Sequence, residues 1–268
     1  MSGIGEALRK GITSGRRRHW ANEPSSGMLV IMKTSTAARA TIRRSAERGH
    51  TEFGWLDSRH SFSFGEYYDP EHVAFRSLRV INDDQVAPGM GFGTHPHRDM
   101  EILTYVVSGQ LQHQDSMGNG RIIEAGELQA MSAGKGITHS EFNPSRTEPA
   151  HFLQIWIQPR EKGLTPSYGE LKPASTPAAL TVLASPDARD GSLLIHQDVV
   201  LLLGTLAEGE SVTYRADPSR GLWVQVITGS LRLDGETLFQ GDSARLEDVA
   251  DLTLTAAEAS KFLVFDLA

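Results

Sequence analysis

The most informative stretch of this chain is Gly91-Phe92-Gly93-Thr94-His95-Pro96-His97-Arg98-Asp99-Met100-Glu101. Side chains alternate between the two faces of a β-strand, so His95 and His97 are expected to point the same way, with ring nitrogens that can converge on one ion. Pro96 cannot donate to a sheet ladder, which indicates an edge strand, a bulge or the mouth of a barrel. The pattern therefore predicts a metal-binding pair of histidines where a ligand can enter.

A second segment, residues 134–143, supplies a third histidine. His139 and Glu141 again share a strand face, and a neutral imidazole and a carboxylate both suit a first-row divalent ion. Asp99 and Glu101 share the parity of the first two histidines, so parity alone leaves the carboxylate open. Three histidines and one carboxylate would leave positions free for water, O2 or substrate, which is typical of catalytic metal sites.

The absence of cysteine narrows the chemistry. The chain has ten histidines and no cysteine, so disulfides, thiolate metal sites and cysteine nucleophiles are excluded, and a metal must bind to nitrogen and oxygen. Histidines outside the two segments are expected to lie on the surface or to be hydrogen-bonded in the core: His60, His72, His113, His151 and His196.

The pattern of apolar residues predicts an all-β protein. From about Thr51 onward, short apolar or alternating runs are cut by Gly, Pro, Asn and Asp, and long stretches with helical spacing are missing. The expected strands include residues 77–81, 102–107, 109–114 and 152–157. The expected turns are Asn82-Asp83-Asp84, Met117-Gly118-Asn119-Gly120, a hairpin tip, and Glu124-Ala125-Gly126.

A weak internal repeat indicates two related β-barrels in tandem. Val107-Ser108-Gly109-Gln110-Leu111, followed by Gly126-Glu127-Leu128, is similar to Ile227-Thr228-Gly229-Ser230-Leu231, followed by Gly241-Asp242-Ser243. Between the copies, residues 159–186 hold five prolines, which places the domain boundary there.

These observations predict four segments: a flexible basic extension over 1–31, an N-terminal metal-binding barrel over 32–165, a linker over 166–185 and a C-terminal barrel over 186–268. The C-terminal barrel is expected to be metal-free. Its counterparts of the first two histidines are Arg215 and Asp217, and the region that matches His139 is apolar around Leu252 and Leu254.

Charge is distributed unevenly along the chain. The net charge is −7, yet residues 1–50 carry ten Lys/Arg against three Asp/Glu. The acidic remainder argues against a nucleic-acid groove. The apolar run 28–32 is too short for a secretion signal and no long apolar span exists, so no membrane association and a cytoplasmic location are expected. Residues 1–27 are expected to be a disordered extension, or to precede a working start at Met28 or Met32.

Together the two histidine segments resemble the paired motifs of the cupin superfamily. The particular residues in these segments resemble those of the pirin family. Further likeness lies in residues 54–57, 60–64, 113–119 and 185–192, so the resemblance covers nearly everything from Thr51 onward. It implies two tandem cupin domains, which are double-stranded β-helix barrels of jelly-roll type. Two extra residues before His139 depart from the general cupin pattern.

The resemblance also implies the ligands and the activity. One divalent ion, expected to be Fe2+ although Mn, Ni, Cu or Zn would accept the same donors, would bind His95, His97, His139 and Glu141. Glu101 competes with Glu141 for the carboxylate role; the family match favours Glu141, and Glu101 is assigned a hydrogen-bonding role, either behind the ligands or elsewhere in the interior. The implied activity is that of a quercetin 2,3-dioxygenase, which opens a flavonol with O2 and releases CO, with Glu141 as both ligand and base.

Two other functions remain open. A metal- or redox-sensing regulatory protein would act through a protein partner rather than by binding nucleic acid directly. A cupin enzyme of another specificity would act on a different small aromatic or enolic metabolite. For an enzyme, the expected partners are a small aromatic substrate and O2, and the expected state is a monomer.

Overall fold

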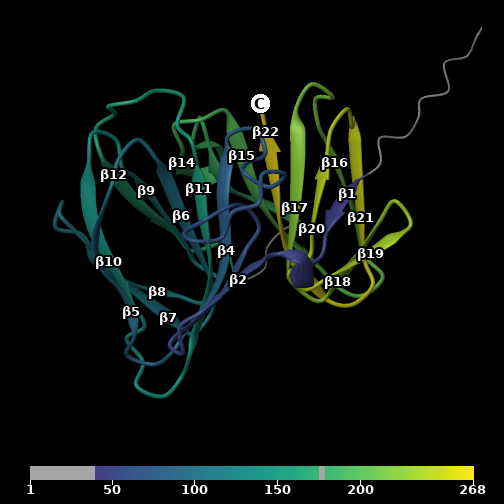
Figure 1. Cartoon of the computed structure of the whole chain (residues 1–268). Coiled ribbons are helices and arrows are strands. Elements are labelled where there is room, and N and C mark those ends of the chain that lie inside the picture. Colours follow the sequence, from purple (N-terminus) through teal and green to yellow (C-terminus); the bar gives the residue numbers. More distant parts are fainter. Residues whose placement is uncertain (1–39, 175–178) are drawn as a thin grey trace, which may run out of the picture. The chain divides into compact units, whose positions relative to one another are not determined.

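The computed structural model describes residues 40–174 and 179–268, and the regular structure there is almost entirely β-strand (Figure 1). The predicted extension over 1–31 lies outside the described residues. Two single 3-10 turns, η1 (Ser45–Glu47) and η2 (Arg189–Gly191), are the helical elements of the described part. No helix there has the length and apolar character needed to cross a membrane. The predicted all-β class is confirmed.

The N-terminal barrel consists of a seven-stranded and a four-stranded antiparallel sheet. The larger sheet has the order β12 (Ser167–Leu171), β9 (Leu128–Ser132), β6 (Glu101–Ser108), β11 (Ala150–Ile157), β4 (Leu78–Val86), β3 (Leu56–His60) and β2 (Gly49–Glu52). The smaller sheet has the order β5 (Gly91–His97), β10 (Ile137–Phe142), β7 (Gln110–Asp115) and β8 (Gly120–Glu124).

The C-terminal barrel repeats this arrangement, which confirms the tandem barrels expected from the sequence repeat. Its seven-stranded sheet has the order β1 (Thr41–Arg43), β20 (Ser243–Leu246), β17 (Gly221–Thr228), β22 (Ser260–Leu267), β15 (Val199–Leu206), β13 (Leu180–Ser185) and β14 (Leu193–Leu194). Its four-stranded sheet has the order β16 (Ser211–Arg215), β21 (Asp251–Ala256), β18 (Ser230–Leu233) and β19 (Glu236–Phe239).

The repeated glycines occupy equivalent turns. Gly109 joins β6 to β7 with φ 73°, and Gly229 joins β17 to β18 with φ 76°. This left-handed backbone conformation favours glycine because a Cβ atom is strained there. A Cβ on Gly109 would also lie 2.5 Å from a backbone carbonyl oxygen of Pro149. The repeat seen in the sequence therefore marks the same turn in both barrels.

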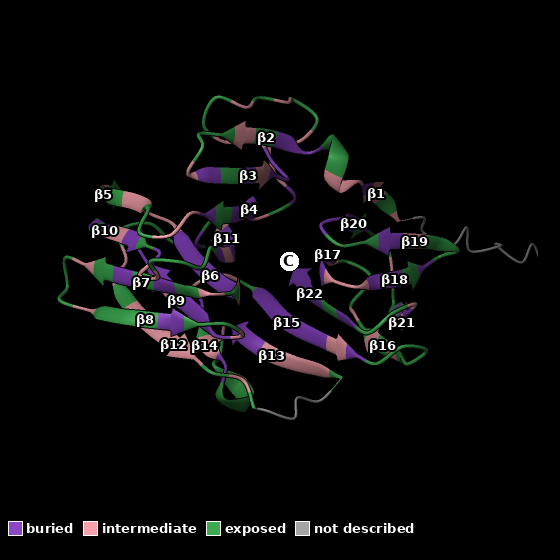
Figure 2. Ribbon diagram, turned by 90° about the horizontal axis from the view of Figure 1, so that it is seen from below, coloured by how far each residue is buried: buried purple, intermediate pink, exposed green. Residues whose placement is uncertain are grey.

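Strand β11 shows how alternation builds the core. Leu153 and Ile155 belong to an apolar cluster that also contains Leu201 of β15 and Phe265 of β22, so the two seven-stranded sheets pack against each other. Figure 2 shows this buried character along β6 and β15. Residues of the opposite parity on β11, including Trp156, face the interior of the N-terminal barrel, where they line a cavity.

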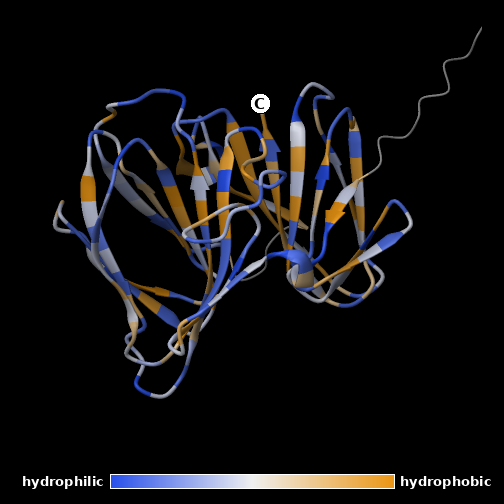
Figure 3. Cartoon of the chain, in the orientation of Figure 1, coloured by the Kyte–Doolittle hydropathy of each residue, from blue (hydrophilic) through white to orange (hydrophobic). Residues whose placement is uncertain are grey.

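The interior of the C-terminal barrel is filled with apolar side chains. Leu252 and Leu254 of β21 are buried in a cluster with Val224 of β17 and Val264 of β22. Figure 3 shows apolar residues concentrated along the central strands of this barrel. The region that corresponds to His139 is therefore part of a packed core.

The structure differs from the predicted segment boundaries at two places. Strand β12 pairs with β9 of the N-terminal barrel and β13 pairs with β15 of the C-terminal barrel, so much of the predicted linker 166–185 belongs to the barrels. Strand β1, predicted within the N-terminal barrel, pairs with β20 of the C-terminal barrel. The proline-rich composition locates the domain boundary approximately. It does not exclude strands there, because prolines such as Pro166 and Pro173 are compatible with strands that begin or end beside them.

One predicted turn is wrong. Asn82-Asp83-Asp84 lies inside β4, and the expected strand 77–81 continues through it to Val86. Asn82 and Asp84 line the cavity of the barrel, whereas Asp83 binds Arg48 on the other face. The polar run is a strand beside a polar cavity, which local composition does not distinguish from a turn. The expected strands that became β6, β7 and β11, and the hairpin turn between β7 and β8, are confirmed.

Candidate metal centre

Strand β10 lies between β5 and β7 in the four-stranded sheet, and this order assembles the site. His139 of β10 is opposite His95 of β5 on one side and opposite Asp115 of β7 on the other. A register shift between His139 and Glu141 interrupts the pairing with β5. Strand β5 is an edge strand of this sheet, which confirms one of the three positions that Pro96 indicated in the sequence.

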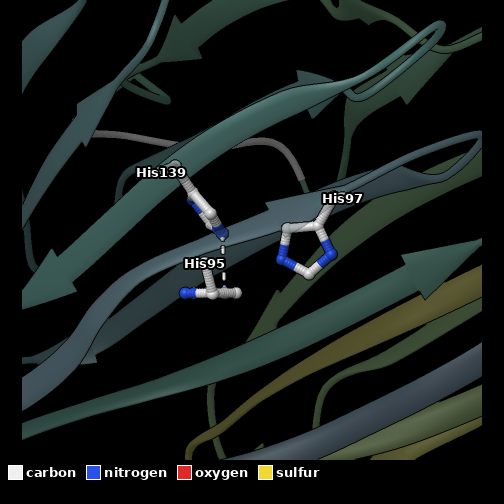
Figure 4. Close-up of side chains that lie close together, drawn as sticks. All are labelled: His95, His97 and His139. Atoms are coloured by element: carbon white, nitrogen blue, oxygen red, sulfur yellow. Dashed lines mark hydrogen bonds between the residues drawn. The ribbon is translucent and has the colours of Figure 1, made fainter.

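Three of the predicted residues converge. His95, His97 and His139 each offer a ring nitrogen within 4.8 Å of the others, and Figure 4 shows their rings turned toward one another. The Nε2 atoms of His95 and His139 are 3.1 Å apart. The Nδ1 atom of His95 lies 2.8 Å from the carbonyl oxygen of Gly93 and donates to it, which leaves Nε2 of a neutral ring as a free acceptor.

Burial keeps two of these rings neutral. Burial lowers the pKa of His139 to about 3, with the neighbouring histidines adding to the effect. Burial, and then the nearby His95, lowers the pKa of His97 to about 4. A metal ligand must be the neutral imidazole, so the site holds the histidines in the form that binds a cation.

Glu141 is fully buried and hydrogen-bonded. The side-chain amide of Gln154 donates to its Oε2 at 2.7 Å, and the hydroxyl of Thr104 lies 3.3 Å from its Oε1. Burial raises the pKa of Glu141 to about 7 despite these hydrogen bonds. Its carboxylate shares a second group of close ligand atoms with His139 and His113, again within 4.8 Å. The predicted ligands thus form two overlapping groups that have His139 in common.

Glu101 lies elsewhere. Its Oε1 accepts a hydrogen bond from Ser132 at 2.7 Å, and its Oε2 lies 3.3 Å from both the backbone nitrogen and Nδ1 of His196. These contacts agree with the interior hydrogen-bonding alternative, and neither partner is one of the proposed metal ligands. Asp99, between β5 and β6, has φ 49° and breaks the strand, so the parity that relates His95 to His97 does not extend to Glu101.

His113 was expected to be an ordinary surface or core histidine, and the structure places it in the core beside the candidate ligands. Its Nδ1 lies 3.5 Å from Nδ1 of His139, and its Nε2 lies 3.2 Å from Oδ2 of Asp115. The phenol ring of Tyr168 stacks on it with ring centroids 4.8 Å apart. No local feature of the sequence indicates this contact, because it depends on the pairing of β7 with β10.

His95, His97 and Glu141 border a cavity of about 580 Å³ inside the N-terminal barrel. This volume lies in the usual range of small-molecule sites. The ring of Trp156 meets the ring of His97 edge to face at 4.9 Å. The other apolar wall residues are Leu56, Phe53, Phe64 and Phe92. The polar wall residues beyond the candidate ligands include Ser58, His60, Asn82, Asp84 and Gln154.

Sequence reasoning missed this polar wall. His60 agrees with the expectation of a hydrogen-bonded core histidine: its Nδ1 lies 2.8 Å from Oδ1 of Asn82 and its Nε2 lies 2.9 Å from the hydroxyl of Thr51. Asp84 is buried, and its Oδ1 has no hydrogen-bond partner among the described residues. The available signal was the alternation of polar residues on β3 and β4, which is typical of a strand that lines a polar cavity.

Family models match both barrels. A model described as pirin matches residues 41–157, and a model described as the quercetinase C-terminal cupin domain matches residues 182–267. Together the two matches span most of the chain.

Individual relatives agree with these matches. Quercetin 2,3-dioxygenase of Escherichia coli strain K12 is 49% identical over 226 residues, which cover 84% of this chain and 97% of the relative. The crystal structure of YhhW from Escherichia coli has a TM-score of 0.84 at 47% identity and covers 86% of this chain and 98% of that one. The crystal structure of bacterial pirin YhhW in complex with nickel(II) has a TM-score of 0.82 at 47% identity, covering 85% and 99%.

Proposed function

The chain belongs to the pirin family, and from this premise we propose that it is a metal-dependent dioxygenase that cleaves a flavonol such as quercetin with O2. The observation that carries the proposal is the convergence of His95, His97 and His139, two of which, His95 and His97, line a cavity of about 580 Å³. The relative that is 49% identical is named quercetin 2,3-dioxygenase, which supplies the substrate class.

The proposed ligands of one divalent ion are His95, His97, His139 and Glu141. The donor set fits such an ion: it offers imidazole nitrogen and carboxylate oxygen only, and burial keeps imidazoles unprotonated. The spacing of 3.1 Å between Nε2 of His95 and Nε2 of His139 also fits. Two nitrogens that bind one ion at about 2.1 Å, at right angles, lie about 3 Å apart. Fe2+ is the expected metal, and nickel(II), which a relative binds, is the first alternative.

The cavity suits a planar aromatic substrate. When bound, the ion would act as a Lewis acid toward the hydroxyl and keto oxygens of a flavonol and would orient O2. The aromatic side chains of Phe92 and Trp156 would pack on the flavonol rings. The polar wall formed by Asn82 and Asp84 would receive the hydroxyl groups of the substrate. Because one wall is aromatic and the other polar, the cavity would bind one orientation of the flavonol better than the reverse orientation.

Glu141 is the proposed base. A carboxyl group whose pKa burial raises to about 7 can take up a proton near neutral pH. It would accept the proton of the flavonol hydroxyl, while the hydrogen bond from Gln154 holds Oε2 in place. In the overall reaction both atoms of O2 enter the product, the central ring opens and one ring carbon leaves as CO.

The proposal is tested by aerobic turnover of quercetin with protein whose metal content has been quantified. Loss of flavonol absorbance and release of CO are followed for the wild type, His97→Ala and Glu141→Gln. We expect metal-dependent release of CO in the wild type, none in His97→Ala, and a large loss of turnover in Glu141→Gln with metal still bound. Bound metal without turnover in the wild type would contradict the proposal and favour a sensing role or another substrate.

A further inference from the structure

We propose that His113 and Asp115 are positioning residues that hold His139 in the one tautomer and orientation that binds the metal ion. The proposal rests on the metal centre proposed above, and it concerns residues that were not among the predicted ligands. In this arrangement the carboxylate of Asp115 holds the imidazole of His113, and His113 in turn holds the ligand His139. Such supports fix the orientation of a metal-bound histidine and make it a stronger donor.

The strand order places His139 between two histidines. On one side, its Nε2 faces Nε2 of His95 at 3.1 Å. On the other side, its Nδ1 faces Nδ1 of His113 at 3.5 Å. Behind His113, the Oδ2 atom of Asp115 lies 3.2 Å from Nε2. The groups therefore form a continuous chain from the carboxylate of β7, through His113, to the candidate ligand on β10.

Hydrogen-bond chemistry assigns the protons along this chain. A carboxylate only accepts, so Nε2 of His113 carries the hydrogen and donates to Asp115. With its single hydrogen on Nε2, the neutral ring of His113 has a bare Nδ1. That bare nitrogen accepts from Nδ1–H of His139. The Nε2 atom of His139 is then unprotonated and points toward His95.

This assignment makes a prediction about the space between His95 and His139. His95 donates through Nδ1 to the carbonyl of Gly93, so its Nε2 is also unprotonated in the neutral ring. Two nitrogen lone pairs then face each other at 3.1 Å. They repel unless a cation or a proton lies between them. The support behind His139 thus aims both lone pairs at the position of one shared cation.

The surroundings of His113 and Asp115 restrict the movement of both side chains. The side chains of His113 and Asp115 are both 0% exposed. The ring of Tyr168 stacks on His113 with an interplanar angle of 23°. Asp115 accepts from the backbone amides of Met117 and Asn119 and from the side-chain amide of Asn119 at 2.8 Å. With its carboxylate held by the hairpin turn, Asp115 cannot rotate away from His113.

A competing assignment makes His113 itself a ligand, since His113, His139 and Glu141 also form a close group. The two assignments exclude each other at His139, because one of its nitrogens faces each neighbour. The cavity favours the first assignment, because His95 and His97 line it whereas His113 does not. An ion held by His113, His139 and Glu141 would have Glu141 as its one ligand from the cavity wall.

The test compares metal affinities of purified full-length variants by competition with a chelator of known Ni2+ affinity. His113→Phe keeps a ring that can stack on Tyr168 but removes the acceptor, and we expect its Kd for Ni2+ to rise about 10- to 100-fold. His113→Asn restores an acceptor near the position of Nδ1, so its affinity is expected to recover most of that loss. Asp115→Asn can donate to Nε2 of His113 and reverse the tautomers, so its Kd is expected to rise as well.

The matched control is His151→Phe, which breaks another histidine–carboxylate pair. In this pair Nε2 of His151 lies 2.6 Å from Oδ1 of Asp83, on the face of the sheet that points away from the cavity. We expect unchanged Ni2+ affinity in this control. An independent readout is the nitrogen chemical shift of His139 in Zn2+-loaded protein, which should report hydrogen on Nδ1 in the wild type and a changed pattern in Asp115→Asn.

The outcomes separate the two proposals. Equal Ni2+ affinity of the wild type, His113→Phe and Asp115→Asn would overturn the support role alone. Complete loss of stoichiometric binding in His113→Phe, together with retained binding in His97→Ala, would make His113 a ligand and would also overturn it. A wild type that binds no Ni2+ would remove the metal centre itself. If His113→Phe does not fold, His113→Asn and Asp115→Asn test the support role through their Ni2+ affinities and the nitrogen chemical shift of His139.

Discussion

The Nε2 atoms of His95 and His139 lie 3.1 Å apart although the residues are 44 positions apart in the sequence. The contact exists because β5 and β10 are neighbours and these two residues are paired across them. Two ring nitrogens at this separation are placed as two ligands of one ion would be. The relationship connects the strand order of the smaller sheet to the proposed chemistry.

Divalent metal is therefore expected to stabilise the fold through these histidines. A ligand that binds only the folded state adds about 2.7 kcal/mol to the free energy of unfolding at a concentration 100 times its Kd. Thermal unfolding of metal-free protein should shift upward on addition of Ni2+, and the shift should vanish in His139→Ala. His72→Ala, a partly exposed histidine outside the site, should keep the full shift. A shift that survives in His139→Ala would place the ion elsewhere.

Close packing of β5 on β10 predicts that Gly91 tolerates no side chain. A Cβ there would lie 2.2 Å from the carbonyl oxygen of Glu141 and 2.5 Å from Cα of Phe142. Gly91→Ala should force the strands apart, lower the free energy of unfolding by about 1–3 kcal/mol and weaken metal binding. Gly93 is the control, since a Cβ on it would meet nothing within 4 Å. Equal stabilities of Gly91→Ala and Gly93→Ala, measured by urea unfolding, would refute this packing.

Asp84 should make the stability of the metal-free protein depend on pH. Burial raises its pKa to about 7, whereas an aspartate in an unfolded chain titrates near pH 4. Between these values the folded state holds a proton that the unfolded state has released, so the free energy of unfolding falls as pH rises through this window. Asp84→Asn removes that penalty.

The variant is therefore expected to be more stable than the wild type at pH 8, by about 1 kcal/mol or more, and to lose this advantage near pH 4. Urea unfolding of both proteins from pH 4 to pH 8 measures the difference between their free energies of unfolding. Glu141, whose pKa burial also raises, is present in both proteins, so its effect is common to both. Parallel stability profiles of the two proteins would show that Asp84 is ionised in the folded state at no cost.

The two barrels are expected to unfold together because their larger sheets share an apolar cluster that includes Trp223. Trp223 of β17 packs on Phe62 and Phe75 of the N-terminal barrel with ring centroids 5.0 Å and 6.0 Å away. Trp223→Ala should cost about 3–5 kcal/mol and weaken both barrels. Hydrogen exchange resolved by segment reports each barrel separately, with Phe239→Ala at an exposed position as the control. Loss of protection confined to the C-terminal barrel would contradict the coupling.

Much of this architecture could be predicted because the governing patterns are local. Strand alternation placed His95 beside His97, and the glycine turns at Gly109 and Gly229 revealed the repeated barrel. Spacing within one strand survives folding, so these inferences needed no tertiary information. The resemblance to the pirin family then related the segment of His139 to the first two histidines, which spacing alone could not do.

The features that escaped prediction depend on pairing between strands. His113 is distinguished only by its neighbour on β10, and Asp84 only by the cavity that its strand lines. Alternation from the two histidines cannot place Glu101 for a related reason, since the backbone leaves the strand conformation at Asp99 between them. Sequence parity holds within a strand and fails across a break in it.

The most direct test of the metal centre is anomalous diffraction from crystals of the protein loaded with Ni2+. One peak is expected per chain, within about 2.1 Å of a nitrogen of each of His95, His97 and His139 and in contact with a carboxylate oxygen of Glu141. A peak bound between His113 and Glu141 instead, or no ordered peak at the three histidines, would contradict the account.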